Sequence, residues 1–304
     1  MTEMEGTAPR TATIARLSGN ARLLITCLRP KQWTKNALLL APLVFAGQLF
    51  NFDSVLRVSL GTVFFSFLAG GLYIINDALD IERDKQHPTK CLRPLASGKL
   101  SLPAALLFAA GSVSFGLTAS FTLSLRFGII AALYAANVLL YSLWIKHVVI
   151  LDVFSISFGF VLRAAAGAYA IGVGVSPWLV ICTICLSLFL GLTKRRAEIA
   201  RLKGEAANHR RALEHYSLPM LDKMIAVVTP STLMCYSLYT FTSRGDYRLM
   251  YTIPLVIFGL LRYLYLAESQ DIADAPEAAL LGDLPLFTAV LLWGVSVVTI
   301  VYFV

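Results

Sequence analysis

Charged side chains are scarce in this chain of 304 residues: they make up 14% of it, whereas soluble domains carry about 25%. Hydrophobic residues make up 57%. Apolar runs of about 20 residues, the length that crosses a bilayer, recur along the whole chain. This composition predicts one integral membrane bundle rather than several soluble domains. We expect nine spans, near 37–52, 56–76, 104–123, 127–145, 149–171, 176–193, 222–242, 249–267 and 284–303.

Three further features are missing. The first 36 residues are polar and basic, and they lack the short apolar core of a cleavable signal peptide. The five cysteines indicate no disulfide framework; Cys182 and Cys185 lie inside an expected span, where we interpret them as packing residues rather than a redox or metal site. No basic or aromatic–basic domain stands outside the spans, which argues against nucleic-acid binding.

The lysines and arginines that are present gather on one side of the expected bundle. With the N-terminus in the cytoplasm, cytoplasmic segments carry twenty of the 26 Lys and Arg residues, and the opposite side carries four. This is the positive-inside distribution of multi-pass proteins. We therefore expect a bacterial inner (plasma) membrane protein with a cytoplasmic N-terminus and an external C-terminus. Its basic face also suits contact with the anionic lipids of the bilayer.

The densest polar segment, residues 76–88, follows the second expected span. Asn76, Asp80 and Asp84 are spaced four residues apart, so a continuing helix would place their oxygens on one face. Such close carboxylates repel each other unless a cation lies between them, and Mg²⁺ prefers oxygen ligands completed by water and phosphate. The alternative is a solvated helix end whose own basic residues compensate the charge. We favour the metal site because the segment emerges directly from an apolar span.

Cations lie near the same membrane boundary. Arg93 is in a loop shaped by Pro88, Pro94 and Gly98, and its guanidinium suits bidentate contact with phosphate. Other boundary cations have two interpretations from residue type alone: they bind phosphate, or they face lipid headgroups and helix C-termini. This second group consists of Lys31, Lys35, Lys146, Lys194 and Arg195.

Arg163 lies inside the fifth expected span, where an arginine requires a partner or a polar cavity. Asp152 precedes it by eleven residues, or three helical turns, and faces nearly the same way. The two could form a structural pair. We favour the alternative, in which they contribute to a cavity for an anionic substrate.

The order and spacing of these motifs resemble the UbiA superfamily of intramembrane prenyltransferases. The N-x-x-x-D-x-x-x-D pattern after the second span is similar to the metal-binding motif of that superfamily. A finer resemblance, from about residue 27 to the C-terminus, is to its decaprenyl-phosphate phosphoribosyltransferase branch. The motifs that carry it are Arg29-Pro-Lys-Gln-Trp-Thr-Lys-Asn36, Asn76-Asp-x-x-Asp-x-Glu-x-Asp84, His87-Pro-x-Lys-x-x-Arg-Pro94, Lys146-His147 and Lys194-Arg195-x-Ala-Glu198.

This resemblance implies an all-α integral membrane fold: a nine-helix UbiA-type bundle (residues 29–304) with a cytoplasmic polar cap and a cytoplasmic arm (1–28). It implies transfer of 5-phosphoribose from phosphoribosyl diphosphate to a decaprenyl-type polyprenyl phosphate, with release of diphosphate. The implied cofactor is Mg²⁺, with Asn76, Asp80 and Asp84 as its ligands and as catalytic residues. The implied substrate-binding residues are Lys31, Lys35, Arg93, Lys146, Arg163, Lys194 and Arg195.

The segment after the sixth span departs from the wider superfamily. Ordinary members carry a second aspartate motif there to hold a prenyl diphosphate, whereas this chain has Lys194, Arg195 and Glu198. Cations at this place suit an acceptor that is a prenyl monophosphate, or a donor that carries a 5-phosphate. The lipid tail should leave through a lateral, apolar opening between helices.

Two other functions stay open. A conventional prenyltransferase of the same fold would join a prenyl diphosphate to an aromatic or haem acceptor. A membrane transporter would share the many spans and the buried Arg163, although broken helices at matched positions are not evident. The sequence also leaves open the lipid length, the oligomeric state (a homo-oligomer included) and the destination of the product. The resemblance implies that the product supplies lipid-linked arabinose. The end use that stays open is either cell-wall arabinan or arabinosylation of a rhizobial nodulation signal.

Overall fold

The computed structural model describes residues 22–202, 215–242, 247–269 and 276–303. Residues 22–27 are helical, and the elements that follow are α-helices and short 3₁₀ helices (η). In chain order they are η1 Pro30–Leu40, α2 Ala41–Phe45, α3 Phe52–Leu79, α4 Ile81–Gln86, η2 Lys90–Leu92, α5 Leu102–Leu123, α6 Leu125–Leu143, η3 Ile145–His147, α7 Leu151–Ala170, α8 Pro177–Leu202, α10 Leu218–Thr242, η5 Tyr247–Thr252, α11 Ile253–Ser269, α12 Pro276–Gly282 and α13 Leu284–Phe303.

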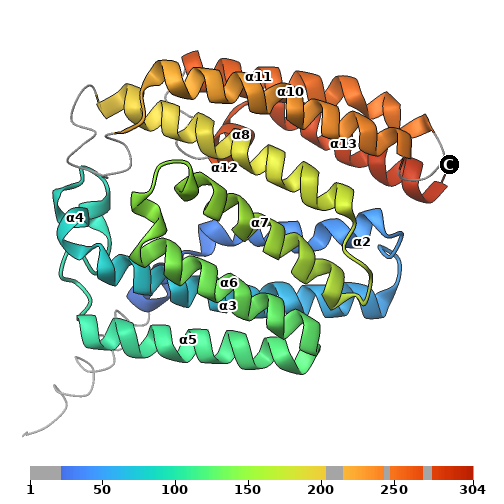
Figure 1. The fold of residues 1–304 in the computed structure, drawn as a ribbon. Helices are drawn as coiled ribbons and strands as arrows, with labels where there is room; N and C mark the ends of the chain where they lie inside the picture. Colours follow the sequence, from blue (N-terminus) through green and yellow to red (C-terminus); the bar gives the residue numbers. More distant parts are fainter. Residues whose placement is uncertain (1–21, 203–214, 243–246, 270–275, 304) are drawn as a thin grey trace, which may run out of the picture.

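Eight of the described helices are long and apolar enough to cross a membrane, and they correspond to the second to ninth expected spans. The all-α membrane fold expected from the sequence is confirmed. In Figure 1 these helices run alongside one another, and the short helix α4 lies at one end of the bundle. The expected segment 37–52 has a different form: it is the 3₁₀ helix η1 followed by the five-residue helix α2.

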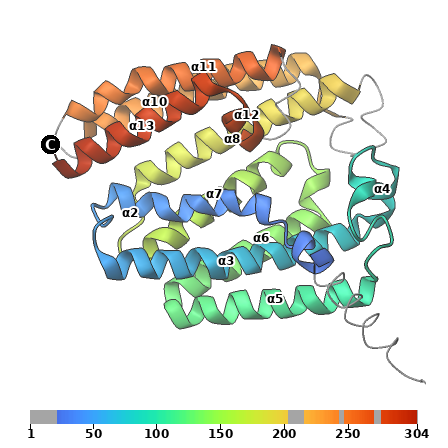
Figure 2. The ribbon, with the colours of Figure 1, turned by 180° about the vertical axis from the view of Figure 1, so that it is seen from behind.

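The segment η1–α2 lies inside the bundle against α3 and α7. Figure 2 shows it running beside α3 along much of that helix. Its buried residues are Asn36 and Leu39 on η1 and Pro42 and Leu43 on α2. The approach to α7 requires glycine at position 167, because a Cβ added there would lie 2.0 Å from the carbonyl oxygen of Leu39. Close backbone contact of this kind is typical of helix packing in membranes.

The buried side chains form separate cores in the two halves of the bundle. One core joins η1–α2, α3, α6 and α7 around Phe65, Phe127 and Tyr134. The second joins α8, α10 and α11 around Phe189 and Leu221. In Figure 1 the chain from α8 onward lies together on one side of the earlier helices. The contact between α7 and α8 connects the two halves.

The polar connections gather at the end of the bundle where α3, α6 and α8 finish (Figure 1). The segment from Asp80 to Leu100 and the η3 turn lie there. Arg57 and Arg126 lie near the starts of α3 and α6, and so at the opposite end. The end that carries more lysine and arginine is the one expected to face the cytoplasm; its orientation in a membrane remains a prediction.

Candidate active site

The acidic segment at the end of α3 bends rather than continuing as one helix. Helix α3 ends at Leu79, Asp80 has φ −105° and ψ 10°, and α4 begins at Ile81. Backbone hydrogen bonds still run from Asp80 N to Asn76 O (3.1 Å) and from Asp84 N to Asp80 O (2.8 Å). The expected continuous helix is thus replaced by two helices that keep the four-residue bonding pattern. The bend occurs where α3 leaves the packed bundle and the Asp80 carboxylate meets a cation from another segment.

Arg93 joins two carboxylates of this segment. Its Nη1 donates to Asp77 Oδ1 at 3.0 Å and to Asp84 Oδ2 at 2.5 Å. Arg29 donates to the same oxygen of Asp77, and its guanidinium carbon lies 5.4 Å from the centre of the Tyr73 ring. The side chains of Asp77 and Asp84 are each 7% exposed, and that of Arg93 is 27% exposed. Cations from two loops therefore hold together carboxylates that would otherwise repel each other.

Asp80 is paired separately. Its Oδ1 accepts a hydrogen bond from Lys146 Nζ at 2.7 Å, and Arg83 Nη1 is 3.7 Å from the same oxygen. The Lys146 side chain is 8% exposed, and a buried ammonium requires such a partner. This pair connects η3 to the end of α3. The structure thereby brings four of the expected site residues to one end of the bundle: Asp80, Asp84, Arg93 and Lys146.

The donor set at this end fits the chemistry of Mg²⁺. Asn76, Asp80 and Asp84 carry the oxygen ligands that the ion prefers, and Asp77 adds a further carboxylate. The Nη1 of Arg93 already places a positive charge between two of these carboxylates. Among the described side chains, no group of three or more His, Cys, Asp and Glu is arranged to hold a metal. The set fits the ion once Arg93 has another anion to bind.

Arg163 lies within the bundle, and its hydrogen bonds go to neutral groups. Its Nε donates to Asn36 Oδ1 at 2.9 Å, and its Nη2 donates to Tyr134 OH at 2.7 Å. Its Nη1 donates to the carbonyl oxygen of Gly159 at 3.0 Å. Asn36 in turn donates to Ser66 Oγ at 2.9 Å. The network connects α7 with η1, α6 and α3, which indicates that Arg163 orders these elements.

Asp152 does not pair with Arg163, so the structural pair that the sequence left open does not form. Eleven residues on α7 leave the two side chains nearly on one face but about 16 Å apart along the helix axis. Asp152 Oδ2 instead accepts a hydrogen bond from Arg195 Nε at 3.0 Å. Its Oδ1 accepts one from Tyr216 OH at 2.9 Å. The partner of Asp152 therefore comes from the end of α8.

The Asp152–Arg195 pair is buried, and its neighbours complete it. Arg195 Nη1 donates to Glu198 Oε2 at 3.0 Å, and its Nη2 lies 3.5 Å from Tyr141 OH. Burial and the neighbouring carboxylate of Asp152 raise the pKa of Tyr216, so the phenol stays protonated and donates its hydrogen. All three guanidinium nitrogens of Arg195 thus have partners within the chain. The cluster closes the junction of α7, α8 and α10.

The other expected phosphate-binding residues lie at the same end. Lys31 is exposed on η1. Lys35 Nζ is 2.5 Å from Gln32 Oε1 and 3.5 Å from Glu277 Oε1, so it connects η1 to α12. Lys194 is partly buried next to Arg195 on α8. These lysines therefore lie on η1 and α8.

Asp77 and Arg29 are candidate site residues that the sequence reasoning did not select. Asp77 precedes Asp84 by seven residues, or two helical turns, and this spacing alone could have indicated a shared face. Arg29 contacts Asp77 across 48 positions of the chain. A single sequence carries no signal for that contact, because the charge of Arg29 is equally explained by the positive-inside rule.

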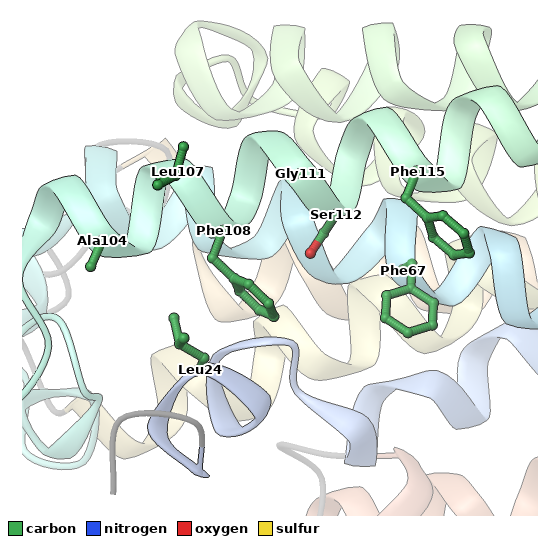
Figure 3. Close-up of a pocket in the computed structure, with 8 residues that line it drawn as sticks. All are labelled: Leu24, Phe67, Ala104, Leu107, Phe108, Gly111, Ser112 and Phe115. Carbon is green, nitrogen blue, oxygen red and sulfur yellow. The ribbon is translucent and has the colours of Figure 1, made fainter. Parts of the chain in front are cut away.

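An apolar groove of about 560 Å³ lies between α5, α3 and the helical residues 22–27. Its lining positions on α5 recur every three or four residues, so the groove follows one face of that helix for about 16 Å. Figure 3 shows the side chains of Leu24 and Phe108 on either side of it, and the hydroxyl of Ser112. The lining residues are Leu24, Phe67, Ala104, Leu107, Phe108, Gly111, Ser112 and Phe115.

The comparisons with known proteins agree on one family. A family model described as "UbiA prenyltransferase family" matches residues 37–291. A decaprenyl-phosphate phosphoribosyltransferase of Corynebacterium glutamicum is 34% identical over 289 residues, which cover 92% of this chain and 86% of that protein. The nodulation protein NoeC of Azorhizobium caulinodans is 29% identical over 181 residues, which cover 59% of this chain and 58% of NoeC.

A solved structure shares the fold. It is a UbiA homolog from Archaeoglobus fulgidus bound to GPP and Mg²⁺, with a TM-score of 0.72 and 18% sequence identity. The match covers 92% of this chain and 99% of that one. At this identity the likeness establishes the fold of the bundle.

Proposed function

The chain belongs to the UbiA prenyltransferase family, and we propose that this member transfers 5-phosphoribose from phosphoribosyl diphosphate to a polyprenyl phosphate, releasing diphosphate. It is a multi-pass membrane protein and a transferase of that family. Its full-length relative in C. glutamicum has the corresponding name. The acceptor length and the use of the product for lipid-linked arabinose, in a cell wall or a nodulation signal, belong to the proposal.

One observation supports the proposal most strongly: acidic and basic side chains meet at the polar end of the bundle. The carboxylates of Asp80 and Asp84 contact Lys146 and Arg93. A diphosphate bound with a divalent cation needs both kinds of group, because carboxylates bind the metal and cations bind the phosphate oxygens. The cation at Lys194, where other family members carry a second aspartate motif, suits a monophosphate acceptor.

The proposed reaction is a single displacement at the anomeric carbon of the ribose. The bond from this carbon to the diphosphate oxygen breaks, and the diphosphate leaves with the electron pair. A non-bridging oxygen of the lipid phosphate forms the new bond from the opposite face. This oxygen is already anionic, so the reaction needs no strong general base. The protein contributes alignment and neutralisation of charge.

The residues of the chain divide into two roles in this reaction. Asn76, Asp77, Asp80 and Asp84 would hold Mg²⁺, which neutralises charge on the leaving diphosphate. Arg93, Lys146 and the lysines of η1 and α8 (Lys31, Lys35, Lys194) would bind phosphate oxygens. In Arg163 and Arg195 all three guanidinium nitrogens already have partners within the chain, so we assign these residues to positioning.

We assign the apolar groove beside α5 to the prenyl chain of the acceptor, where the sequence led us to expect a lateral apolar opening (Figure 3). Leu24 lines this groove, and Arg29, five residues later, contacts Asp77. A lipid lying along α5 would therefore have its tail beside Leu24 and its phosphate near Arg29. The groove runs along α5 from its first turn past the middle of the helix, as a membrane-embedded tail requires.

The test uses purified protein in lipid nanodiscs with radiolabelled phosphoribosyl diphosphate, decaprenyl phosphate and Mg²⁺. The proposal expects a labelled lipid product and one diphosphate per transfer. Product formation only from a prenyl diphosphate and an aromatic acceptor would identify a conventional prenyltransferase instead. Accumulation of label inside proteoliposomes without a covalent product would identify a transporter.

A further inference from the structure

The carboxylates at the end of α3 are neutralised by the chain itself. Asp77 contacts Arg29 and Arg93, Asp84 contacts Arg93, and Asp80 contacts Lys146. Three carboxylates thus contact three cations from other segments, namely the N-terminal segment, the loop after η2, and η3, and Asp80 also has Arg83 of α4 at 3.7 Å. These carboxylates are the proposed metal ligands, and two of the cations, Arg93 and Lys146, are proposed phosphate ligands.

We infer that Arg93 and Lys146 exclude a bare divalent cation from this site, and that they move from carboxylate to phosphate when the metal arrives with a diphosphate. The inference rests on the proposed function, because it takes a diphosphate as the incoming anion. It assigns the two residues a role in the order of binding: the metal and the diphosphate bind together, and each binds weakly alone.

Geometry requires an exchange of this kind. The Nη1 of Arg93 lies within 3.0 Å of an oxygen on each of Asp77 and Asp84. A metal bound to Asp84 Oδ2, the oxygen that Arg93 contacts, would place two positive charges side by side, so Arg93 has to leave it. A guanidinium that leaves a buried carboxylate without a new anion loses its charge-assisted hydrogen bonds. The oxygens of a diphosphate provide that anion.

Two arginines, Arg29 and Arg93, contact Asp77, and the structure indicates which of them moves. Arg29 is held over the Tyr73 ring and remains as a partner for Asp77. Arg93 is held by carboxylates on its Nη1 and lies in a loop between η2 and α5. Its departure therefore leaves one cation beside Asp77 and frees Asp84.

Coupling between two ligands is reciprocal, so it can be measured from either side. The probes are Mn²⁺, followed by electron paramagnetic resonance of the free ion, and ³²P-labelled inorganic diphosphate, followed by retention on the protein. Full-length protein in nanodiscs is used without lipid acceptor. For wild-type protein we expect weak binding of Mn²⁺ alone, and retention of diphosphate that depends on the divalent cation.

Arg93→Gln is the decisive variant because its expected effects on Mn²⁺ binding and on diphosphate binding have opposite signs. Removing the cation should strengthen binding of Mn²⁺ alone by about ten- to a hundredfold. The same variant should weaken metal-dependent retention of diphosphate by a similar factor. Lys146→Gln should likewise strengthen binding of Mn²⁺ alone and weaken retention of diphosphate, because it removes the cation beside Asp80. Arg93→Lys keeps the charge and should stay within a few-fold of wild type for Mn²⁺ alone.

Arg57→Gln is the matched control, since it removes an exposed arginine paired with Asp53 at the opposite end of the bundle. Size-exclusion profiles and melting temperatures establish that each variant is folded. Unchanged or weaker Mn²⁺ binding in folded Arg93→Gln and Lys146→Gln would overturn the inference. If the proposed function is wrong but the inference is right, the result differs: the variants still bind Mn²⁺ more tightly and diphosphate more weakly, while no phosphoribosyl lipid is formed.

Discussion

Individual side chains at the polar end of the bundle have two kinds of partner, and the kind of partner predicts the effect of substitution. The proposed metal ligands Asp80 and Asp84 contact cations that can exchange onto a substrate. Asp152 and Arg195 contact each other in a buried pair. Loss of a residue of the first kind should reduce activity, whereas loss of one of the second kind should reduce stability.

Asp80→Asn and Asp84→Asn test the metal ligands while keeping the side-chain shape. Each should lower the rate of phosphoribosyl transfer by at least about a hundredfold, because charge stabilisation of the leaving group is lost. The measurement is initial rate at saturating Mg²⁺. Asp53→Asn, an exposed carboxylate at the other end, is the control and should keep wild-type activity. A rate near wild type in either site variant contradicts the assignment.

Arg195→Gln should destabilise the protein by about 3–5 kcal/mol, because it leaves Asp152 as an unpaired buried charge. The second variant, Arg195→Gln with Asp152→Asn, removes both charges and should recover most of that loss. Thermal unfolding in nanodiscs measures both. Equal destabilisation in the single and double variants would mean that the ion pair is not the cause.

Lys194→Gln separates phosphate binding from membrane anchoring. If Lys194 binds a substrate phosphate, the variant should raise the Michaelis constant of one substrate by about ten- to a hundredfold and leave the melting temperature unchanged. Phosphoribosyl diphosphate and polyprenyl phosphate are titrated separately, so the affected substrate identifies which phosphate is bound. Lys223→Gln, an exposed lysine on α10, is the control. Unchanged constants for both substrates would remove Lys194 from the site.

Whole elements were predicted well from the sequence, and contacts between elements were not. Hydropathy located all eight long helices, because burial in a bilayer requires a continuous apolar run whatever the helix packs against. The pairing of Asp152 depended on which residue of α8 arrives beside it. That information lies in three-dimensional packing, so the sequence grouped Asp152 with Arg163, whereas its ion pair is with Arg195. The spacing of Asp77 from Asp84 could be read from the sequence, but its contacts with Arg29 and Arg93 could not, because they also depend on packing.

At the scale of one helix, α5 offers a test of the groove. Gly111 lines it, and a Cβ added there would meet no atom within 4 Å, so a larger side chain enters the groove without disturbing the backbone. Gly111→Phe should raise the Michaelis constant of the polyprenyl phosphate several-fold and leave that of phosphoribosyl diphosphate unchanged. Gly259→Phe on α11, also in open space, is the matched control. Equal Michaelis constants for polyprenyl phosphate in wild type, Gly111→Phe and Gly259→Phe would mean that the prenyl tail binds elsewhere.

The whole molecule is asymmetric along the direction of its helices, with one end rich in ionic contacts. That end carries the acidic segment, the cations that pair with it and the Asp152 cluster. The two cores of the bundle lie side by side, so both halves contribute segments to the same end. A soluble, highly charged donor would therefore meet the site at the membrane surface.

Cysteine labelling tests the orientation of this asymmetry. In a background without native cysteines, Asn51→Cys lies at the end opposite the acidic segment, and Ser97→Cys lies near that segment; both positions are exposed. A membrane-impermeant maleimide added to intact cells should label Asn51→Cys and should label Ser97→Cys only after permeabilisation, because the basic end is expected in the cytoplasm. The reverse pattern would invert the topology.

The 3₁₀ geometry of η1 changes how far a short stretch of chain reaches. A 3₁₀ helix rises about 2.0 Å per residue against 1.5 Å in an α-helix, so η1 and α2 together extend about 30 Å, the thickness of the hydrocarbon layer. Sixteen residues, Pro30 to Phe45, are therefore long enough to cross the hydrocarbon layer, although they lie outside the eight long apolar helices of the described residues.

The same geometry makes η1 sensitive to register. With three residues per turn, every third side chain shares a row: Asn36 and Leu39 are buried, whereas the row through Lys31, Thr34 and Ala37 is exposed. Deleting one residue would rotate the following rows by about 120°. The amide of Asn36 would then turn away from Arg163, and a different side chain would face the glycine on α7. This crossing consequently tolerates changes of residue type on its outer row far better than any change of length.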